Sequence, residues 1–67
     1  MNDLSASAAI LLAYAKQNAN KDKVVDLQEY TGLPENTTVS ACKELLKRGL
    51  ISDIGYSEFS VEYIILK

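Results

Sequence analysis

Residues 31–51 read TGLPENTTVSACKELLKRGLI, and this stretch decides the fold. Pro34 suits the first position of a helix because its φ angle is already close to the helical value. Glu35 complements the positive end of the helix dipole, and Arg48 complements the negative end. Gly49 supplies the conformation at which many helices end. The stretch therefore predicts a helix from Glu35 to Arg48, and the apolar residues that follow it predict a strand.

The segment upstream, SASAAILLAYAKQ, predicts a first helix because it is rich in alanine and leucine. Asp3 or Ser5 can cap its N-terminus, and the pattern extends to about Gln17 or Asn18. Apolar residues cover almost the whole circumference of this helix: Leu4, Ala8, Ala9, Ile10, Leu11, Leu12, Ala13, Tyr14 and Ala15. Either the helix is central to the fold, or one side of it meets a second subunit.

The region between the two helices predicts two short elements. Residues 24–25, both valine, predict a very short strand. Residues 26–31 predict a short helix, with Leu27 and Tyr30 pointing inward at helical spacing. Gly32 ends that helix.

The C-terminal region predicts a β-hairpin. Residues 50–56 and 59–66 have the composition of strands. In the second run, one face of the strand is expected to carry Phe59, Val61, Tyr63 and Ile65, and the other face Ser60, Glu62, Ile64 and Leu66. Residues 55–58 would form the turn between them. The predicted order is helix, short strand, helix, turn, helix, strand, strand, which is a three-helix α+β domain spanning residues 1–67.

The residues 24–51, VVDLQEYTGLPENTTVSACKELLKRGLI, followed by a hairpin, resemble a winged helix-turn-helix domain. Such domains occur in many bacterial, archaeal and phage transcription regulators. The glycines at Gly32 and Gly49 stand at the distance usual in that family, and two apolar residues follow the second glycine. The resemblance implies that the helix Glu35–Arg48 is the recognition helix, which inserts into the major groove of DNA, and that the hairpin is the wing.

Two registers for the core face of this recognition helix remain open. In the first register Thr38 takes the position of the usual core valine, and the buried residues are Thr38, Ala41, Cys42 and Leu45. In the second register, which a longer turn would give, the buried residues are Val39, Cys42 and Leu46. At the position where the family usually has a small residue, this chain has Gln28.

In either register the recognition helix presents polar side chains to solvent. Asparagine can pair with adenine, hydroxyl groups can bond bases or phosphates, and basic side chains can neutralise phosphates. The residues expected to contact DNA are Glu35, Asn36, Thr37, Ser40, Lys43, Lys47 and Arg48. These residue types also fit an ordinary solvated helix surface, since they display no specific base code.

Net charge weighs against strong DNA binding. The chain carries −2 overall, whereas DNA-binding domains usually have a basic footprint. The hairpin contains Asp53, Glu58 and Glu62, and its tip has no lysine or arginine. We therefore expect few phosphate contacts, weak binding by a monomer and a shallow dependence on salt.

Partners other than DNA follow from the same observations. A homodimer would double the contacts. Its interface could use apolar residues of the first helix, Ala9, Leu12 and Ala13, and of the last strand, Ile64 and Leu66. The same residues could instead belong to the core of the domain. An acidic winged helix can also present its surface to another protein, and this is the alternative to DNA binding.

Composition excludes several other classes of function. The chain has 67 residues, one cysteine and no histidine, so no internal disulfide or metal-ligand cluster is expected. No phosphate-binding loop or catalytic serine motif occurs, and we expect neither enzymatic activity nor a cofactor. The longest apolar run is too short for a membrane span, and the N-terminus does not resemble a signal peptide. The expected location is the cytoplasm.

Overall fold

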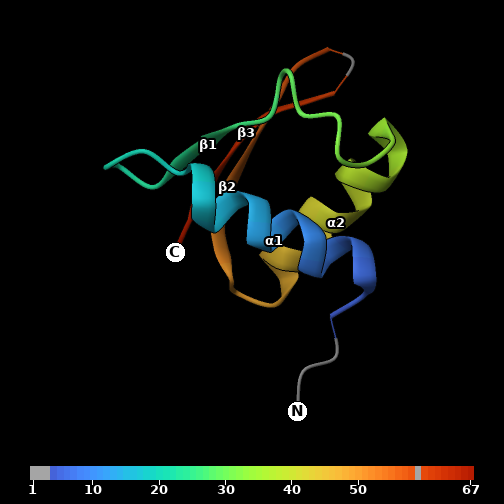
Figure 1. Cartoon of the computed structure of the whole chain (residues 1–67), viewed down its shortest axis with the longest axis horizontal. Coiled ribbons are helices and arrows are strands. Elements are labelled where there is room, and N and C mark those ends of the chain that lie inside the picture. Colours follow the sequence, from blue (N-terminus) through green and yellow to red (C-terminus); the bar gives the residue numbers. More distant parts are fainter. Residues whose placement is uncertain (1–3, 59) are drawn as a thin grey trace.

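In the part of the chain that the structure describes, two helices pack on one side of a three-stranded antiparallel sheet (Figure 1). This computed structural model describes residues 4–58 and 60–67. The elements, in chain order, are α1 (Ala6–Asn18), β1 (Val24–Asp26), α2 (Glu35–Lys47), β2 (Ile51–Tyr56) and β3 (Val61–Leu66). The α+β class is therefore confirmed. Within the described residues, neither helix is long and apolar enough to cross a membrane.

Helix α1 has the predicted bounds. Ser5 is its N-cap, because the hydroxyl of Ser5 accepts a hydrogen bond of 3.2 Å from the backbone N–H of Ala8. The alternative cap, Asp3, lies outside the described residues. The helix buries Ala8, Leu11 and Ala15 against the core. Its opposite face stays exposed although it is apolar: Ala6, Ala9, Ile10 and Ala13.

Helix α2 adopts the first of the two predicted registers. Its buried residues are Thr38, Ala41, Cys42 and Leu45. The second register is wrong, because Leu46 is 42% exposed and Val39 only packs against the edge of the core. The hydroxyl of Thr38 is satisfied in the buried position by donating a bond of 3.0 Å to the carbonyl of Pro34.

The ends of α2 lie close to their predicted positions. Pro34 is the residue before the first helical turn, and its carbonyl accepts the N–H of Thr38 at 2.8 Å. The helix ends at Lys47, with Arg48 as C-cap, one residue earlier than expected. Gly49 adopts a φ angle of +74°, a conformation that glycine reaches without steric cost.

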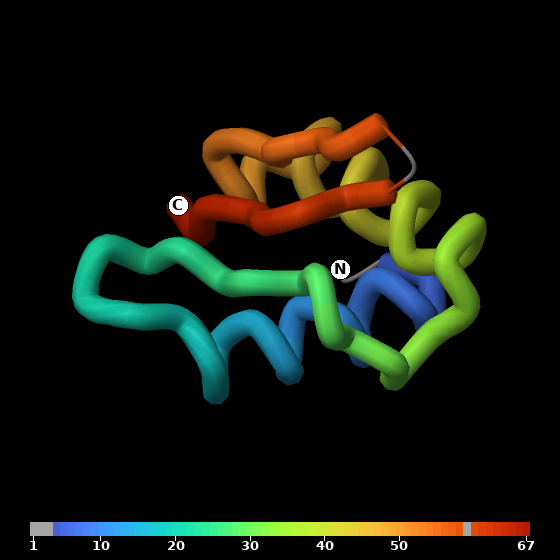
Figure 2. Tube along the Cα trace, turned by 90° about the horizontal axis from the view of Figure 1, so that it is seen from above, coloured from blue at the N-terminus to red at the C-terminus, as the bar shows by residue number. Residues whose placement is uncertain are grey.

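The sheet has the order β1-β3-β2, with the last strand in the centre (Figure 2). Cross-strand partners form three rows. The middle row, Val25–Ile64–Ile54, is buried in the same core as the two helices. The flanking rows, Asp26–Tyr63–Gly55 and Val24–Ile65–Asp53, point to the other side, since neighbouring residues of a strand alternate between faces.

The short helix predicted for residues 26–31 does not form, so the three-helix prediction is wrong. Asp26 pairs with Tyr63 in the sheet, and the N–H of Leu27 donates to the carbonyl of Glu62 at 2.9 Å. The few residues left before Gly32 form too few helical hydrogen bonds to offset the unfavourable free energy of helix nucleation. They form a single turn instead, in which the Asp26 carboxylate accepts the N–H of Gln28 at 2.8 Å.

The hairpin turn is displaced from its predicted position. Gly55 belongs to β2, where it pairs with Tyr63, and the chain reverses after Tyr56. A register shift follows: Tyr56 pairs with Val61, so Glu62 is an extra residue in β3. This β-bulge reverses the predicted alternation, and for that reason Val61 and Ile64 are both buried. The predicted strand residue Phe59 lies outside the described residues.

The two residues of the last strand that were considered for a homodimer interface, Ile64 and Leu66, belong to the core. Ile64 is fully buried, and Leu66 packs against the buried cluster. In α1, Leu12 also packs against that cluster, whereas Ala9 and Ala13 are exposed. Of the residues considered for a homodimer interface, only those on the outer face of α1 are accessible.

Candidate nucleic-acid interface

The exposed face of α2 carries a polar and basic stripe. Asn36, Ser40, Lys43 and Lys47 follow one another at a spacing of three or four residues, so they lie on one face of the helix. All four are exposed, and they lie opposite the buried residues of α2. The register of the core thus turns these four predicted residues outward together. We call this group the α2 stripe.

Glu44, which follows Lys43 in α2, points away from the α2 stripe and toward α1. Its carboxylate accepts hydrogen bonds from the hydroxyl of Ser5 at 2.7 Å and from the backbone N–H of Ser5 at 2.8 Å. These bonds from Ser5 hold the pKa of Glu44 below its ordinary value. The negative charge of Glu44 is thus engaged at the N-terminus of α1, beside the α2 stripe. This arrangement joins residues far apart in sequence, and no local pattern signals it.

The other three predicted contact residues lie off the α2 stripe. Glu35 is exposed in the first turn, on the flank of α2 that faces the hairpin. Thr37 is half-buried on the opposite flank, the one that carries Glu44. Arg48 is exposed at the C-cap, one turn beyond Glu44. The structure therefore divides the seven predicted residues into a group of four and three separate positions.

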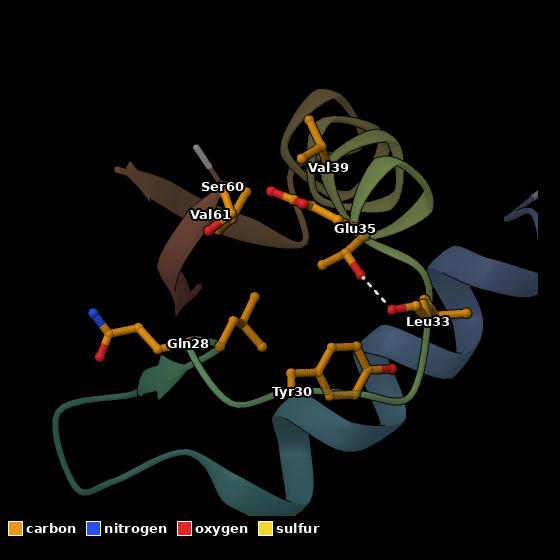
Figure 3. Close-up of a pocket in the computed structure, with 9 residues that line it drawn as sticks. Gln28, Tyr30, Leu33, Glu35, Val39, Ser60 and Val61 are labelled. Carbon is orange, nitrogen blue, oxygen red and sulfur yellow. Dashed lines mark hydrogen bonds between the residues drawn. The ribbon is translucent and has the colours of Figure 1, made fainter. Parts of the chain in front are cut away.

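A hollow of about 230 Å³ lies between α2, the turn after β1 and the start of β3 (Figure 3). Part of the segment predicted as a short helix lines it: Leu27, Gln28 and Tyr30. Its lining combines apolar and polar side chains: Leu27, Gln28, Tyr30, Leu33, Glu35, Thr38, Val39, Ser60 and Val61. Sites for small molecules usually exceed roughly 300 Å³, so this hollow is too small for a typical cofactor.

Tyr30 forms the wall of this hollow that lies nearest to α1. Its ring centroid is 4.5 Å from that of Tyr14, with the planes tilted by 45°. Among the described residues, the buried hydroxyl of Tyr30 has no hydrogen-bond partner. Burial raises the pKa of Tyr30, and the neighbouring Tyr14 adds to the effect. The ring also lies against Gly32, where a β-carbon would collide with it.

The hairpin brings negative charge to the N-terminal end of α2. Ser60 and Val61, at the start of β3, line the same hollow as Glu35 (Figure 3). Glu58 is exposed in the hairpin turn, and Glu35 is exposed in the first turn of α2. The basic residues of α2 all lie in its C-terminal half. Charge thus changes sign along the helix, from acidic beside the hairpin to basic at the other end.

Cys42, the one cysteine of the sequence, lies in an environment that suppresses the reactivity of its thiol. Cys42 is fully buried, and burial raises the pKa of its thiol to about 11. A thiol in that environment is a poor nucleophile and a poor metal ligand. In the part of the chain that the structure describes, histidine, cysteine, aspartate and glutamate form no group of three suited to a metal ion.

Comparison with known proteins finds no family model, no curated relative and no solved structure that matches this chain.

Proposed function

We propose that this protein is a small DNA-binding module of the winged-helix type, which acts in transcription regulation or as an accessory DNA-binding factor. The element order α1-β1-α2-β2-β3 and the strand order β1-β3-β2 are compatible with such a domain. A tight turn stands in place of the second helix. The α2 stripe would enter the major groove, with the hairpin as the wing.

The observation that carries the proposal is the composition of the α2 stripe. Two lysines and two small polar side chains point outward together, while Glu44 is bonded to Ser5. Lys43 and Lys47 would neutralise phosphates, and Asn36 has the donor and acceptor pair that adenine requires. Arg48, one residue beyond the helix, would add a further phosphate contact.

The charge of the hairpin limits how the domain would bind. An acidic wing beside the N-terminal turn of α2 opposes close approach to phosphates at that end. Binding would therefore depend on the C-terminal half of α2, with about two or three phosphates neutralised. The expected slope of log K against log salt is about −2 to −3, since each phosphate contributes about −0.9.

The proposal can be tested by following labelled protein by NMR during titration with a mixed-sequence DNA duplex at low salt. We expect shifts confined to residues 36–48, reversed when salt is added. Lys43→Ala and Lys47→Ala should each weaken binding and make the salt slope shallower by about one. Lys21→Ala, which removes the same charge from the loop before β1, is the matched control and should have little effect.

Two outcomes would contradict this assignment. If Lys21→Ala weakens binding as much as Lys43→Ala, the interaction is a general attraction rather than docking of α2. If the duplex causes no shifts, selection against a random DNA library is the second measurement. If neither the titration nor the selection detects binding, the proposal that this protein binds DNA is wrong.

A second candidate function is a module that binds protein rather than DNA. The net charge of −2 and the acidic hairpin favour it. The exposed apolar face of α1, on which Ile10 is 50% exposed, suits contact with another subunit or with a second copy. A sedimentation measurement of mass against concentration distinguishes a homodimer from a monomer that awaits a different partner.

A further inference from the structure

The outer face of the sheet, which neither helix covers, has an apolar and aromatic centre with carboxylates around it. Its two rows are Asp26–Tyr63–Gly55 and Val24–Ile65–Asp53. Glu62, the bulged residue of β3, borders the same surface beside Tyr63. We call these residues the outer sheet face. The two rows and Glu62 contain three carboxylates and no basic side chain.

The ring of Tyr63 leans toward β2. Gly55 lies directly across from it, and a β-carbon there would collide with the ring, so the ring occupies the space that glycine leaves. Tyr63 is nevertheless 37% exposed. Its other side borders a hollow of about 240 Å³ on the β1 side, lined by Val24, Asp26, Gln28, Glu62 and Tyr63.

Gln28 holds the two carboxylates of this hollow in position. Its backbone N–H donates to the Asp26 carboxylate at 2.8 Å, and its side-chain amide donates to the Glu62 carboxylate at 3.4 Å. Each bond uses only one oxygen of its carboxylate, and a carboxylate has room for more than one donor. The bulge at Glu62 is what brings that side chain to the hollow.

We propose that the outer sheet face docks a basic segment of a protein partner, with an arginine side chain in the hollow beside Tyr63. A guanidinium group is planar, stacks on aromatic rings and pairs with carboxylates through two parallel bonds. The chain that carries the arginine would cover two half-buried residues, Val24 on the edge strand β1 and Ile65 on the central strand β3. This inference does not depend on DNA binding, because the α2 stripe lies on a different side of the molecule.

The negative charge and the apolar centre of the outer sheet face favour a basic protein segment over three other ligands. A nucleic acid would bring phosphates toward three carboxylates, which like charge opposes. A second copy of this chain would place its own acidic outer face against the same charges. A free polyamine would satisfy the carboxylates and leave the apolar centre uncovered. A basic protein segment satisfies both parts of the surface.

The test uses the full chain, labelled for NMR, at low salt, and the synthetic peptide Ac-Gly-Arg-Leu-Arg-Gly-NH₂ as probe. A peptide with citrulline in place of arginine has the same shape without the charge, and spermidine supplies the charge without the apolar side chain. We expect the arginine peptide to shift the amides of residues 24–28 and 53–65. The citrulline peptide and spermidine should shift them at least about fivefold less at equal concentration.

Variants locate the contact. The double variant Asp26→Asn, Glu62→Gln should weaken peptide binding about tenfold, whereas Glu35→Gln, Glu58→Gln changes net charge equally and should leave it nearly unchanged. Tyr63→Leu should weaken binding about two- to fivefold, and Tyr63→Phe, which keeps the ring, should not.

Several results would overturn the proposal. These are equal weakening by the two double variants, equal shifts with spermidine, shifts elsewhere on the protein, or no shifts at all. Shifts on this face that depend on protein concentration without peptide would assign it to a second copy instead. Because the DNA titration monitors residues 36–48 and this titration monitors the sheet, failure of one leaves the other unaffected.

Discussion

Ser5 donates two hydrogen bonds to the carboxylate of Glu44, from its hydroxyl at 2.7 Å and from its backbone N–H at 2.8 Å. The same hydroxyl caps α1 by accepting the N–H of Ala8. One serine therefore starts the first helix and fixes the second helix against it. This contact also determines which charges α2 shows to solvent, so the packing of the helices and the candidate interface are linked.

Replacement of Ser5 by alanine should lower the free energy of unfolding by about 1 kcal/mol, the usual cost of losing an N-cap. For a domain of this size the midpoint of thermal unfolding should fall by about 4–8 °C. Calorimetry or circular dichroism would measure the change. Ser40→Ala, at an exposed position within α2, is the control and should leave the midpoint unchanged or slightly higher. Equal stability of the Ser5 variant would contradict the capping role.

The contact between Ser5 and Glu44 predicts a specific pH dependence. The folded protein holds the pKa of Glu44 below its ordinary value of 4.5. The stabilisation is thus complete above that pH and is lost as the pH falls through the lowered pKa. Thermal unfolding of Glu44→Gln and the unchanged protein should differ most near neutral pH and converge in acid, once the pH is below the lowered pKa of Glu44. Glu58→Gln is the control; a difference that persists in acid would argue against this linkage.

Cys42 should be protected from thiol reagents in the folded protein. At pH 8 a thiol with a pKa of about 11 has about a hundredfold less thiolate than one at the ordinary value of 9.0. Since the side chain is also fully buried, labelling should be at least about a hundred times slower than in urea. Quenching the reaction at successive times and weighing the products by mass spectrometry gives the labelling rates of the folded and the urea-unfolded protein. Comparable rates would mean that α2 separates readily from the core.

Tyr30→Phe should not destabilise the domain, and we expect a gain of about 1 kcal/mol. The change removes a buried hydroxyl that lacks a partner among the described residues, and the ring contact with Tyr14 is kept. Denaturant unfolding would measure the gain. Tyr56→Phe, at a position that is 54% exposed, is the control and should change little. A loss of about 1 kcal/mol, the usual cost of losing a hydrogen bond, would mean that the hydroxyl has a partner.

Gly55→Ala should cost about 1–3 kcal/mol, because the added methyl group displaces the ring of Tyr63 from its place on the strand. The cost should shrink when Tyr63 is first replaced by alanine, since the obstacle is then gone. A double-mutant cycle should give a coupling of at least about 0.5 kcal/mol. Strict additivity would mean that the backbone at residue 55, and not the ring, resists a side chain.

The sequence predicted the fold class and the limits of both helices, because caps and stop signals act locally. It could not choose between the two registers of α2. A threonine resembles valine in shape, and its burial depends on whether its hydroxyl finds a partner. In the folded chain that partner is the carbonyl of Pro34, one turn earlier. The α2 stripe follows directly from this choice.

The errors in the prediction share one physical origin, which is pairing between distant strands. Asp26 has the composition of a helix start, but its backbone belongs to the sheet opposite Tyr63. The bulge at Glu62 likewise depends on the register against β2. Neither feature has a local signal. The hollow beside Tyr63 is built from both, so sequence patterns did not indicate it.

The position of β3 in the centre of the sheet also has a consequence for the order of folding. Strand β2 is joined to β3 by a short turn, so the hairpin closes a small loop, and α2 directly precedes it. Strand β1 pairs with β3 only after the chain has passed through α2 and β2, since Val24 pairs with Ile65, so this pairing closes a much longer loop. We expect β1 to dock late and to open first in hydrogen exchange. Asp26, at the end of that strand, would then reach its place beside Tyr63 only in the final step of folding.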